Sequence, residues 1–295
     1  MGTFSERLDA LLALDHGYVG EKGRTIARVH GSRRPRAVVL LHGLSSSPAQ
    51  FGRFAEELFG RGHNVVVPRL PRHGHADRLS RAQARLTGEE LLAASREVVE
   101  IGRELGEHVT VAGFSLGGLM AAWIAQHYEI DRAVAIAPFF GVALFPNRTM
   151  TLLSELLLRI PNRFPWWHPI KRERLQPEHG YPRYSTHALA HAILIARSLL
   201  AEAAEAPPLA HRIVLVHNAS ESAVNNRAIR RLHAIWSGRR PGAVDILELR
   251  GLPPSHDIVE PLQRSALADR VYPALLEAID PCDSKEAALR SYEGE

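Results

Sequence analysis

Six short apolar runs, separated by amphipathic stretches of helical length, limit the fold of this chain more than any other feature of its sequence. The runs are Ala37–Leu41, Asn64–Pro68, Val109–Gly113, Ala133–Ala137, Ile213–His217 and Val244–Leu249. They are rich in Val, Ile and Leu with little alternation, as expected of parallel strands covered on both faces. The helical stretches include Ala49–Arg61, Gly88–Leu105, Leu116–Tyr128 and Gln263–Ala278. This alternation predicts an α/β fold with a mostly parallel central sheet flanked by helices, and Arg24–Val29 is a candidate edge strand.

One segment interrupts this alternation. Between Pro138 and Arg212 there is no convincing strand, but a stretch rich in proline and aromatic residues and two helical runs, Thr151–Arg159 and Thr186–Ala206. Pro and Gly punctuate the segment at several points, as they do in irregular connections. We therefore expect a helical cap over residues 139–211, inserted between the two parts of one core domain, residues 1–138 and 212–295.

The composition is that of a globular protein whose 295 residues are enough to bury a full core. The single cysteine, Cys282, excludes an internal disulfide and fits a reducing compartment. The chain begins with acidic residues where a signal peptide has a basic and then an apolar region, and no run approaches about 20 apolar residues. These features predict a cytoplasmic address and no stable membrane anchor.

The charge is moderately basic, with 36 Lys and Arg residues against 32 Asp and Glu residues. The arginines are scattered, and the densest groups, Arg33–Arg36 and Lys171–Arg174, are short and not interleaved with aromatic residues. This pattern favours a solvated surface and gives no indication of a nucleic-acid partner. An anionic ligand or a lipid surface is the alternative that such groups leave open.

The most informative stretch is Val109–Gly118, which reads Val-Thr-Val-Ala-Gly-Phe-Ser-Leu-Gly-Gly. It is an apolar run, then the pattern G-x-S-x-G, and then the start of a helical segment. A serine on such a strand-to-helix turn needs small neighbours, and its hydroxyl projects alone at the carboxyl edge of the sheet. We predict that Ser115 is a nucleophile; the alternative is a tight glycine turn with an ordinary serine.

A second turn, His42-Gly43-Leu44, ends the first apolar run. Glycine permits a backbone conformation there that lets the next amide face the nucleophile. The helix after Ser115 points its first amides to the same place. We predict that the backbone N–H groups of Leu44 and Leu116 form an oxyanion hole, with a plain strand-ending turn as the alternative, and that His42 braces the loop rather than transferring protons.

One of the 16 histidines stands where a general base is needed. His256 follows the last apolar run and precedes a helical segment, within Pro253–Asp257. A base must lie within reach of the serine, on a loop after a late strand, and the order serine before histidine is the one that this kind of sheet uses. We predict His256 as the base; the alternative is a surface or capping histidine.

The third member of a triad should be a carboxylate after the run Arg212–His217. The loop that follows, Asn218–Val224, has Glu221 as its only acidic residue. A carboxylate there would orient the imidazole and stabilise the imidazolium. The other candidates are Asp245, Glu248 and Asp257. Asp245 and Glu248 lie within a predicted strand and Asp257 adjoins the histidine, so Glu221 is preferred.

Over nearly its whole length the chain resembles α/β-hydrolases of the carboxylesterase and monoacylglycerol-lipase-like kind. The residues that carry the resemblance are His42-Gly43, Pro68 to Pro71 with Gly74-His75, Gly113 to Gly118, Ser255-His256-Asp257, and the cap position between Ala137 and Arg212. The chain departs from the pattern at residue 221, where relatives usually carry Asp in H-G-x-x-D-x-x-V and this sequence has Glu. Other hydrolases of this fold use Glu.

The resemblance implies an esterase or lipase mechanism through an acyl-enzyme, acting on a small acyl substrate. No metal or organic cofactor is expected, because H-E-x-x-H, paired C-x-x-C and G-x-G-x-x-G patterns are absent from the sequence. Four aromatic residues of the cap, Phe139, Phe140, Trp166 and Trp167, are candidates to line an apolar acyl pocket, although such residues more often pack a cap onto a sheet. Two alternatives stay open: the same triad acting on an amide, lactone or carbon–carbon bond, and a non-catalytic relative that binds a ligand. The sequence does not indicate an oligomeric state.

Overall fold

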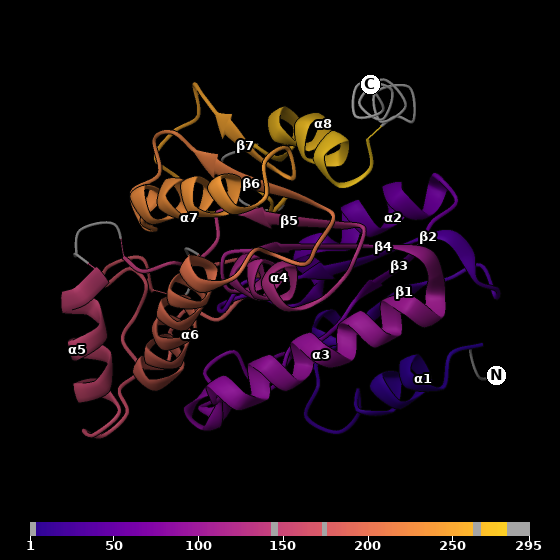
Figure 1. Ribbon diagram of the computed structural model, residues 1–295. Helices are drawn as coiled ribbons and strands as arrows, with labels where there is room; N and C mark the ends of the chain where they lie inside the picture. The colour runs from indigo at the N-terminus through magenta and orange to yellow at the C-terminus, as the bar shows by residue number, and fades with distance from the viewer. Residues whose placement is uncertain (1–3, 143–146, 173–175, 262–266, 282–295) are drawn as a thin grey trace.

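The computed structural model describes residues 4–142, 147–172, 176–261 and 267–281. The predicted strands form one seven-stranded sheet in the order β1-β3-β2-β4-β5-β6-β7 (Figure 1). The strands are β1 (Ile26–Arg28), β2 (Arg34–Leu41), β3 (Asn64–Val67), β4 (Gly106–Phe114), β5 (Arg132–Ile136), β6 (Arg212–Asn218) and β7 (Val244–Leu249). Every pairing is parallel except that of the edge strand β1 with β3. The prediction of a mostly parallel sheet is therefore confirmed.

Helices cover both faces of the sheet, with α2 and α8 on one face and α3 and α4 on the other (Figure 1). The helices are α1 (Glu6–Ala13), α2 (Gly52–Gly60), α3 (Gly88–Leu105), α4 (Leu116–His127), α5 (Asn147–Leu157), α6 (Thr186–Glu205), α7 (Asn226–Arg239) and α8 (Ala268–Ile279). Short 3₁₀ turns are η1 (Glu21–Gly23), η2 (Pro48–Phe51) and η3 (Ala82–Arg85). Helices α1 and α7 were not predicted, and the predicted start of α8 falls in residues 262–266, outside the described residues.

Local chemistry explains where the central elements begin. Helix α3 starts after a capping box, in which Thr87 Oγ1 accepts a hydrogen bond from the Glu90 amide and the Glu90 carboxylate accepts one from the Thr87 amide. Helix α4 is buried almost all round, which matches a sequence without a polar face. It follows β4 directly, so the turn between them, at Ser115, lies at the carboxyl edge in the middle of the sheet.

Helices α5 and α6 come between β5 and β6 and lie side by side at one end of the molecule (Figure 1). Within the described part of residues 139–211 there is no strand, only the isolated bridges of Val142 and Trp166. Helix α6 packs against α3, α4 and α7 through residues such as Ile193 and Leu199. The limits of the cap, residues 139–211, and of the core, residues 1–138 and 212–295, stay a prediction.

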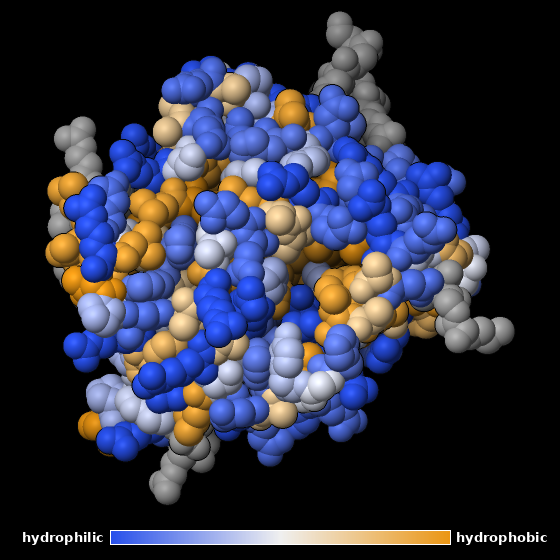
Figure 2. Space-filling model, turned by 90° about the horizontal axis from the view of Figure 1, so that it is seen from below, coloured by the Kyte–Doolittle hydropathy of each residue, from blue (hydrophilic) through white to orange (hydrophobic). Residues whose placement is uncertain are grey.

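Two features of this insertion concern apolar surface. Helix α6 has the length and composition of a membrane span, but half of its most apolar window is buried in the fold, as in the core helix of a globular protein. By contrast, apolar side chains on α5 and in the loop after it are exposed, among them Leu152 (70% exposed) and Ile170 (86%). Figure 2 shows apolar surface at this end of the molecule.

Candidate active site

Ser115 occupies the sharp turn between β4 and α4. Its φ of 55° and ψ of −110° lie in a region that a serine rarely adopts. The turn is held by hydrogen bonds from the Ser115 amide to the Ile136 carbonyl (2.9 Å) and from the Phe139 amide to the Ser115 carbonyl (3.0 Å). The surrounding backbone fixes this strained conformation and leaves the hydroxyl free to contact His256.

The glycines beside Ser115 are required by close backbone approaches. A Cβ added to Gly113 would lie 2.2 Å from the Gly117 carbonyl oxygen, and one added to Gly117 would lie 1.9 Å from the carbonyl oxygen of Leu41. Both distances are far below any real contact, and both partners are backbone atoms that cannot move aside. The G-x-S-x-G pattern is thus the only way to bring β4, α4 and the end of β2 this close together around Ser115.

His256 lies between Ser115 and Glu221. Its Nε2 is 2.9 Å from Ser115 Oγ, and its Nδ1 is 2.9 Å from Glu221 Oε2. An ionised carboxylate only accepts hydrogen bonds, so Nδ1 carries the proton and Nε2 is the acceptor for the serine hydroxyl. The imidazole also packs against the Phe114 ring, with centroids 4.9 Å apart. The structure therefore brings together the three residues predicted for the triad.

Glu221 is the carboxylate in contact with the histidine. Its side chain is 1% exposed, and its Oε1 accepts a hydrogen bond from the Ala223 amide at 2.7 Å. Burial by itself raises the pKa of this carboxyl, but the hydrogen bond and charge of His256 and the amides of Ala223 and Val224 outweigh it, so the pKa is lowered. Glu221 is consequently ionised under the conditions in which a neutral histidine acts as a base.

The other three candidate carboxylates contact different partners. Asp257 accepts hydrogen bonds from Gln50 and from the amides of Val259 and Glu260. Glu248 contacts His217, Arg230 and Arg250. Asp245 lies near the start of β7, exposed and opposite Val214 of β6. Of the four carboxylates considered, Glu221 is the one that meets His256.

Hydrogen bonds in the loop after β2 fix the orientation of the Leu44 amide. The Gly43 carbonyl accepts a hydrogen bond from the Ser46 amide at 3.1 Å and lies 2.9 Å from His42 Nδ1. Because C=O and N–H point in opposite directions across a trans peptide, fixing the Gly43 carbonyl also fixes the direction of the Leu44 N–H. Gly43 itself lies against the nucleophile, since a Cβ added to it would be 3.7 Å from Ser115 Cβ.

His42 is neutral and bonded at both ring nitrogens. Burial, and then the charge of His73, holds the pKa of His42 well below its usual value. Its Nε2 accepts a hydrogen bond from the Leu70 amide at 3.2 Å, so its Nδ1 is the donor to Gly43. This arrangement agrees with the prediction that His42 braces the loop. The second predicted donor, the Leu116 amide, is the first of α4, where helix geometry leaves N–H groups without an intrahelical partner.

Gln50 is a residue of the site that the sequence did not indicate. It is 1% exposed; its Oε1 accepts a hydrogen bond from the Gly43 amide (3.0 Å), and its Nε2 donates one to Asp257 Oδ2 (2.8 Å). It thereby links the loop of the predicted oxyanion donor to the loop of His256. Gln50 falls within a stretch predicted as helix, and no sequence pattern distinguishes it from a surface glutamine.

Residues 179–181 of the cap region are tied to the same loop. The buried side chains of His179 and Glu260 lie 2.9 Å apart, and His179 Nδ1 lies 3.1 Å from Ser47 Oγ. The Tyr181 amide donates to the Ser45 carbonyl at 2.7 Å. The cap region, the loop after β2 and the histidine loop therefore form one hydrogen-bonded unit around Ser115.

The four aromatic residues predicted for an acyl pocket lie in two different places. Phe139 and Phe140 are buried directly after β5, and the Phe139 amide bonds to Ser115. Trp167 is 39% exposed and packs on Tyr184, with ring centroids 4.2 Å apart. The guanidinium groups of Arg172 and Arg183 lie 5.6 and 5.4 Å from the centroid of the Trp166 ring. The contacts of both tryptophans are thus with other residues of the cap region, and their role toward a substrate stays a prediction.

Within the described residues, no group of three His, Cys, Asp or Glu side chains is arranged to hold a metal ion. The site offers a serine hydroxyl, an imidazole within hydrogen-bond distance of it, an ionised carboxylate behind the imidazole, and the predicted amide donors of Leu44 and Leu116. Such a set of groups is suited to nucleophilic acyl transfer.

Comparison with known proteins agrees with this geometry. A family model described as "Alpha/beta hydrolase family" matches residues 38–290. The thermostable monoacylglycerol lipase of Bacillus sp. (strain H-257) is 28% identical over 95 residues, which are 32% of this chain and 36% of that lipase, so the match spans about a third of the relative's length.

Solved structures extend the likeness to most of the chain. The monoacylglycerol lipase of Paleococcus ferrophilus aligns with a TM-score of 0.64 and 21% identity, over 86% of this chain and 97% of that one. A soluble variant of the monoglyceride lipase of Saccharomyces cerevisiae aligns with a TM-score of 0.64 and 14% identity, over 83% and 87% of the two chains. At these identities the likeness shows the fold.

Proposed function

Because this chain belongs to the alpha/beta hydrolase family, we propose that it is a serine hydrolase that cleaves carboxylic esters through the triad Ser115, His256 and Glu221. The observation that carries the proposal is the continuous pair of 2.9 Å contacts, from Ser115 Oγ to His256 and from His256 to Glu221, at a strained strand-to-helix turn. An ordinary serine in a glycine turn has no reason to face a histidine that is itself oriented by a buried carboxylate.

The geometry supports a two-step reaction. Ser115 Oγ attacks the acyl carbon while His256 Nε2 takes its proton, and the carbonyl oxygen, now an oxyanion, accepts hydrogen bonds from the amides of Leu44 and Leu116. As the carbon–oxygen bond to the alcohol breaks, His256 gives its proton to the leaving oxygen. Water then attacks the acyl-serine by the same route, and the acid is released. Glu221 stabilises the imidazolium in both steps without taking its proton.

For the substrate we propose an ester with an apolar acyl chain, of the monoacylglycerol kind. The buried residues Phe139 and Phe140, of which Phe139 bonds through its amide to the Ser115 carbonyl, and the exposed apolar side chains of the cap region support an apolar partner. The relative from Bacillus sp., named a monoacylglycerol lipase, supports the same class. A test is the turnover of p-nitrophenyl esters from acetyl to dodecanoyl: if Trp166→Ala and the parent show the same chain-length profile, Trp166 does not select the acyl chain.

The proposal is tested by hydrolysis of p-nitrophenyl butyrate and by labelling with a fluorophosphonate. The wild type should hydrolyse the ester and be labelled, whereas Ser115→Ala should lose labelling and about 10⁴-fold or more of kcat. Ser198→Ala, which removes an exposed serine on α6, is the matched control and should behave as the wild type. Labelling that persists in Ser115→Ala would refute Ser115 as the nucleophile. A wild type that is labelled but inert to all esters would favour an amide, lactone or carbon–carbon bond as the target.

A further inference from the structure

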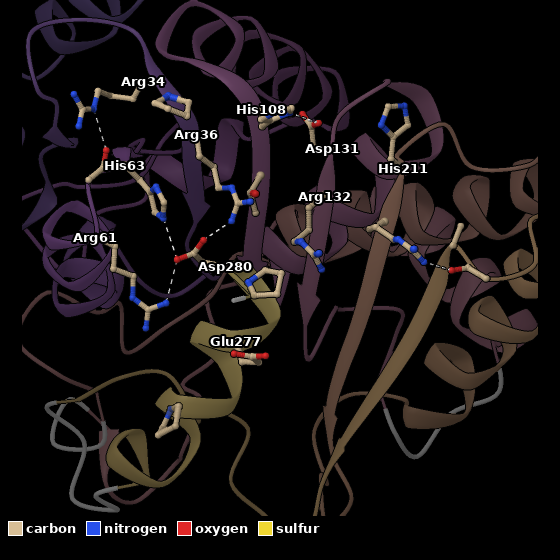
Figure 3. A pocket seen from close by; sticks show the side chains of 18 of the residues that line it. Arg34, Arg36, Arg61, His63, His108, Asp131, Arg132, His211, Glu277 and Asp280 are labelled. Atoms are coloured by element: carbon tan, nitrogen blue, oxygen red, sulfur yellow. Dashed lines mark hydrogen bonds and ion pairs between the residues drawn. The ribbon is translucent and has the colours of Figure 1, made fainter. Parts of the chain in front are cut away.

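A second recess lies at the opposite edge of the sheet from Ser115. It has a volume of about 1260 Å³ and is formed around the amino-terminal ends of β2, β4, β5 and β6, with α8 on one side (Figure 3). We call it the amino-edge cleft. The β4 residues that line the cleft, His108 and Thr110, precede Ser115 by seven and five positions, a distance of roughly 16–23 Å at the usual rise of a strand. The cleft is therefore not part of the site described above.

The residues that line the amino-edge cleft are strongly basic. Six are arginines: Arg34, Arg36, Arg61, Arg132, Arg212 and Arg240. Three more are histidines, His63, His108 and His211, whereas the carboxylates number three, Asp131, Glu277 and Asp280. With all histidines neutral, the lining carries an excess of three positive charges, most of the net charge of +4 of the whole chain.

One carboxylate serves several of these cations. Asp280 contacts Arg36, Arg61 (3.1 Å) and His63 (2.9 Å) at the same time (Figure 3). Burial alone raises the pKa of Asp280, but the hydrogen bonds and charges of His63, Arg61 and Arg36 outweigh it, and the pKa falls far below its usual value. The six arginines of the lining outnumber its three carboxylates, so positive potential extends into the cleft.

Other arginines of the cleft donate to carbonyl groups, which orient the guanidinium. Arg34 donates to the Gly62 carbonyl at 3.1 Å, and Arg212 donates to the carbonyl of Gly242. Arg240 donates to three consecutive carbonyls, those of residues 208–210. These contacts fix cationic side chains around the recess before any ligand arrives, which lowers the entropy cost of binding.

The sheet itself places two arginines side by side. Arg132 of β5 and Arg212 of β6 are register partners, so their Cα atoms lie about 4.8 Å apart and their side chains leave the same face. Paired guanidinium groups match phosphate oxygens in geometry as well as charge.

We propose that the amino-edge cleft binds a polyphosphate-bearing small molecule, with Arg132 and Arg212 as its central contacts. Several cations around one recess favour a ligand with more than one phosphate over a single phosphate. The volume exceeds that of the phosphates alone and has room for an organic group attached to them. The proposal does not depend on the reaction at Ser115.

The test is isothermal titration of the full chain with inorganic tripolyphosphate, and with orthophosphate for comparison, in about 0.1 M salt. One tripolyphosphate should bind per chain, at least about tenfold more tightly than orthophosphate. The variant R132Q/R212Q should lose at least about tenfold in affinity. The control R227Q/R231Q removes the same charge from exposed positions on α7 and should bind within about twofold of the wild type.

Three results would overturn the proposal: no binding by the wild type, an equal loss in the control, or equal affinity for the two anions. An equal loss would mean that only the net charge attracts the anion. If R132Q/R212Q does not fold, as judged by circular dichroism and thermal unfolding, R61Q replaces it. Arg61 lies at the rim, with its side chain 41% exposed, and its removal should cost about threefold in affinity. An unchanged affinity in folded R61Q would then count against the cleft.

Discussion

At the carboxyl edge of the sheet, buried polar groups meet partners of matching chemistry. The imidazole of His256 has the hydroxyl of Ser115 on one side and the carboxylate of Glu221 on the other, and Gln50 joins two loops through one acceptor and one donor. At the amino edge, arginines outnumber carboxylates, and Asp280 contacts three basic side chains at once. The contacts at the carboxyl edge fix the positions of atoms, as catalysis requires. The excess of arginines at the amino edge produces a positive electrostatic potential, which attracts an anion.

After Ser115→Ala, the largest effect is expected from Glu221→Gln at the carboxyl edge. The variant keeps the size of the side chain but removes the charge that stabilises the imidazolium, so kcat for p-nitrophenyl butyrate should fall about 10³–10⁴-fold. Glu221→Asp keeps the charge and shortens the reach by one methylene, so it should retain part of the activity. If Glu221→Gln stays within tenfold of the wild type, the acid is another residue, and Asp257 or Asp245 would be tested next.

A smaller effect is expected from Gln50→Leu, because Gln50 acts on the site through other groups. Leucine leaves the Gly43 amide and the Asp257 carboxylate without their partner and loosens the loop that carries the Leu44 amide. We expect kcat to fall about 10–100-fold with KM changed by less than about threefold, since an oxyanion donor acts in the transition state. Gln50→Glu keeps an acceptor for the Gly43 amide but loses the donor to Asp257, so it tests the two contacts of Gln50 one at a time.

A purely structural role for Gln50 would give a different result. In that case the loss of activity would follow the loss of folded protein, and kcat per folded molecule, measured by active-site titration with a fluorophosphonate, would not change. Such an outcome would remove Gln50 from the catalytic arrangement and leave it as a packing residue.

Gln50 also shows where inference from the sequence ends. The sequence predicts the strands from their hydrophobic pattern and the turn at Ser115 from the spacing of its glycines. It predicts His256 from its place in the chain after the last strand. Glu221 was preferred by its place after β6, and the structure puts it against His256. The bridge from Gly43 through Gln50 to Asp257 includes a contact between residues 207 positions apart, and no local pattern records such a contact.

The amino-edge cleft escaped sequence analysis for a similar reason. The basic residues that line it come from several strands and loops, and only Arg34 and Arg36 belong to a dense group in the sequence. Scattered arginines favour a solvated surface as long as their positions in space are unknown. Parallel strands bring their amino ends to one edge, and this gathers Arg36, Arg132 and Arg212 without any signal along the chain.

Asp280→Asn probes the amino edge. Removing this carboxylate takes away the negative charge that Arg36, Arg61 and His63 contact, so the free energy of unfolding should fall by about 2 kcal/mol at pH 7. The pKa of Asp280 is lowered in the folded chain, so its contribution is present above the ordinary aspartate pKa of about 3.9 and is lost as the pH falls toward the folded-state value. Urea unfolding of both proteins at pH 7 and pH 3 should show the difference shrinking.

The same variant sharpens the contrast between the edges. Asp280→Asn should leave kcat at Ser115 within about twofold of the wild type, because the strands separate the two sites. Tripolyphosphate should bind about two- to fivefold more tightly, since one opposing charge is gone from the cleft. A large loss of activity in a folded Asp280→Asn protein would mean that the two edges are coupled, and the comparison would no longer hold.

The smallest effect is expected from Lys22→Ala, next to the buried contacts of His179. Lys22 pairs with Glu178 at 2.7 Å, but the two side chains are 54% and 83% exposed, so water and salt screen the pair. Its loss should change the free energy of unfolding by less than about 0.5 kcal/mol.

The neighbouring His179 and Glu260 lie 2.9 Å apart with almost no exposure. Removing one would leave the other buried without its partner, so His179→Leu should lower the free energy of unfolding several times more than Lys22→Ala does. If Lys22→Ala and His179→Leu lowered the free energy of urea unfolding equally, burial would not explain the strength of the contacts between residues 178–181 and the loop after β2.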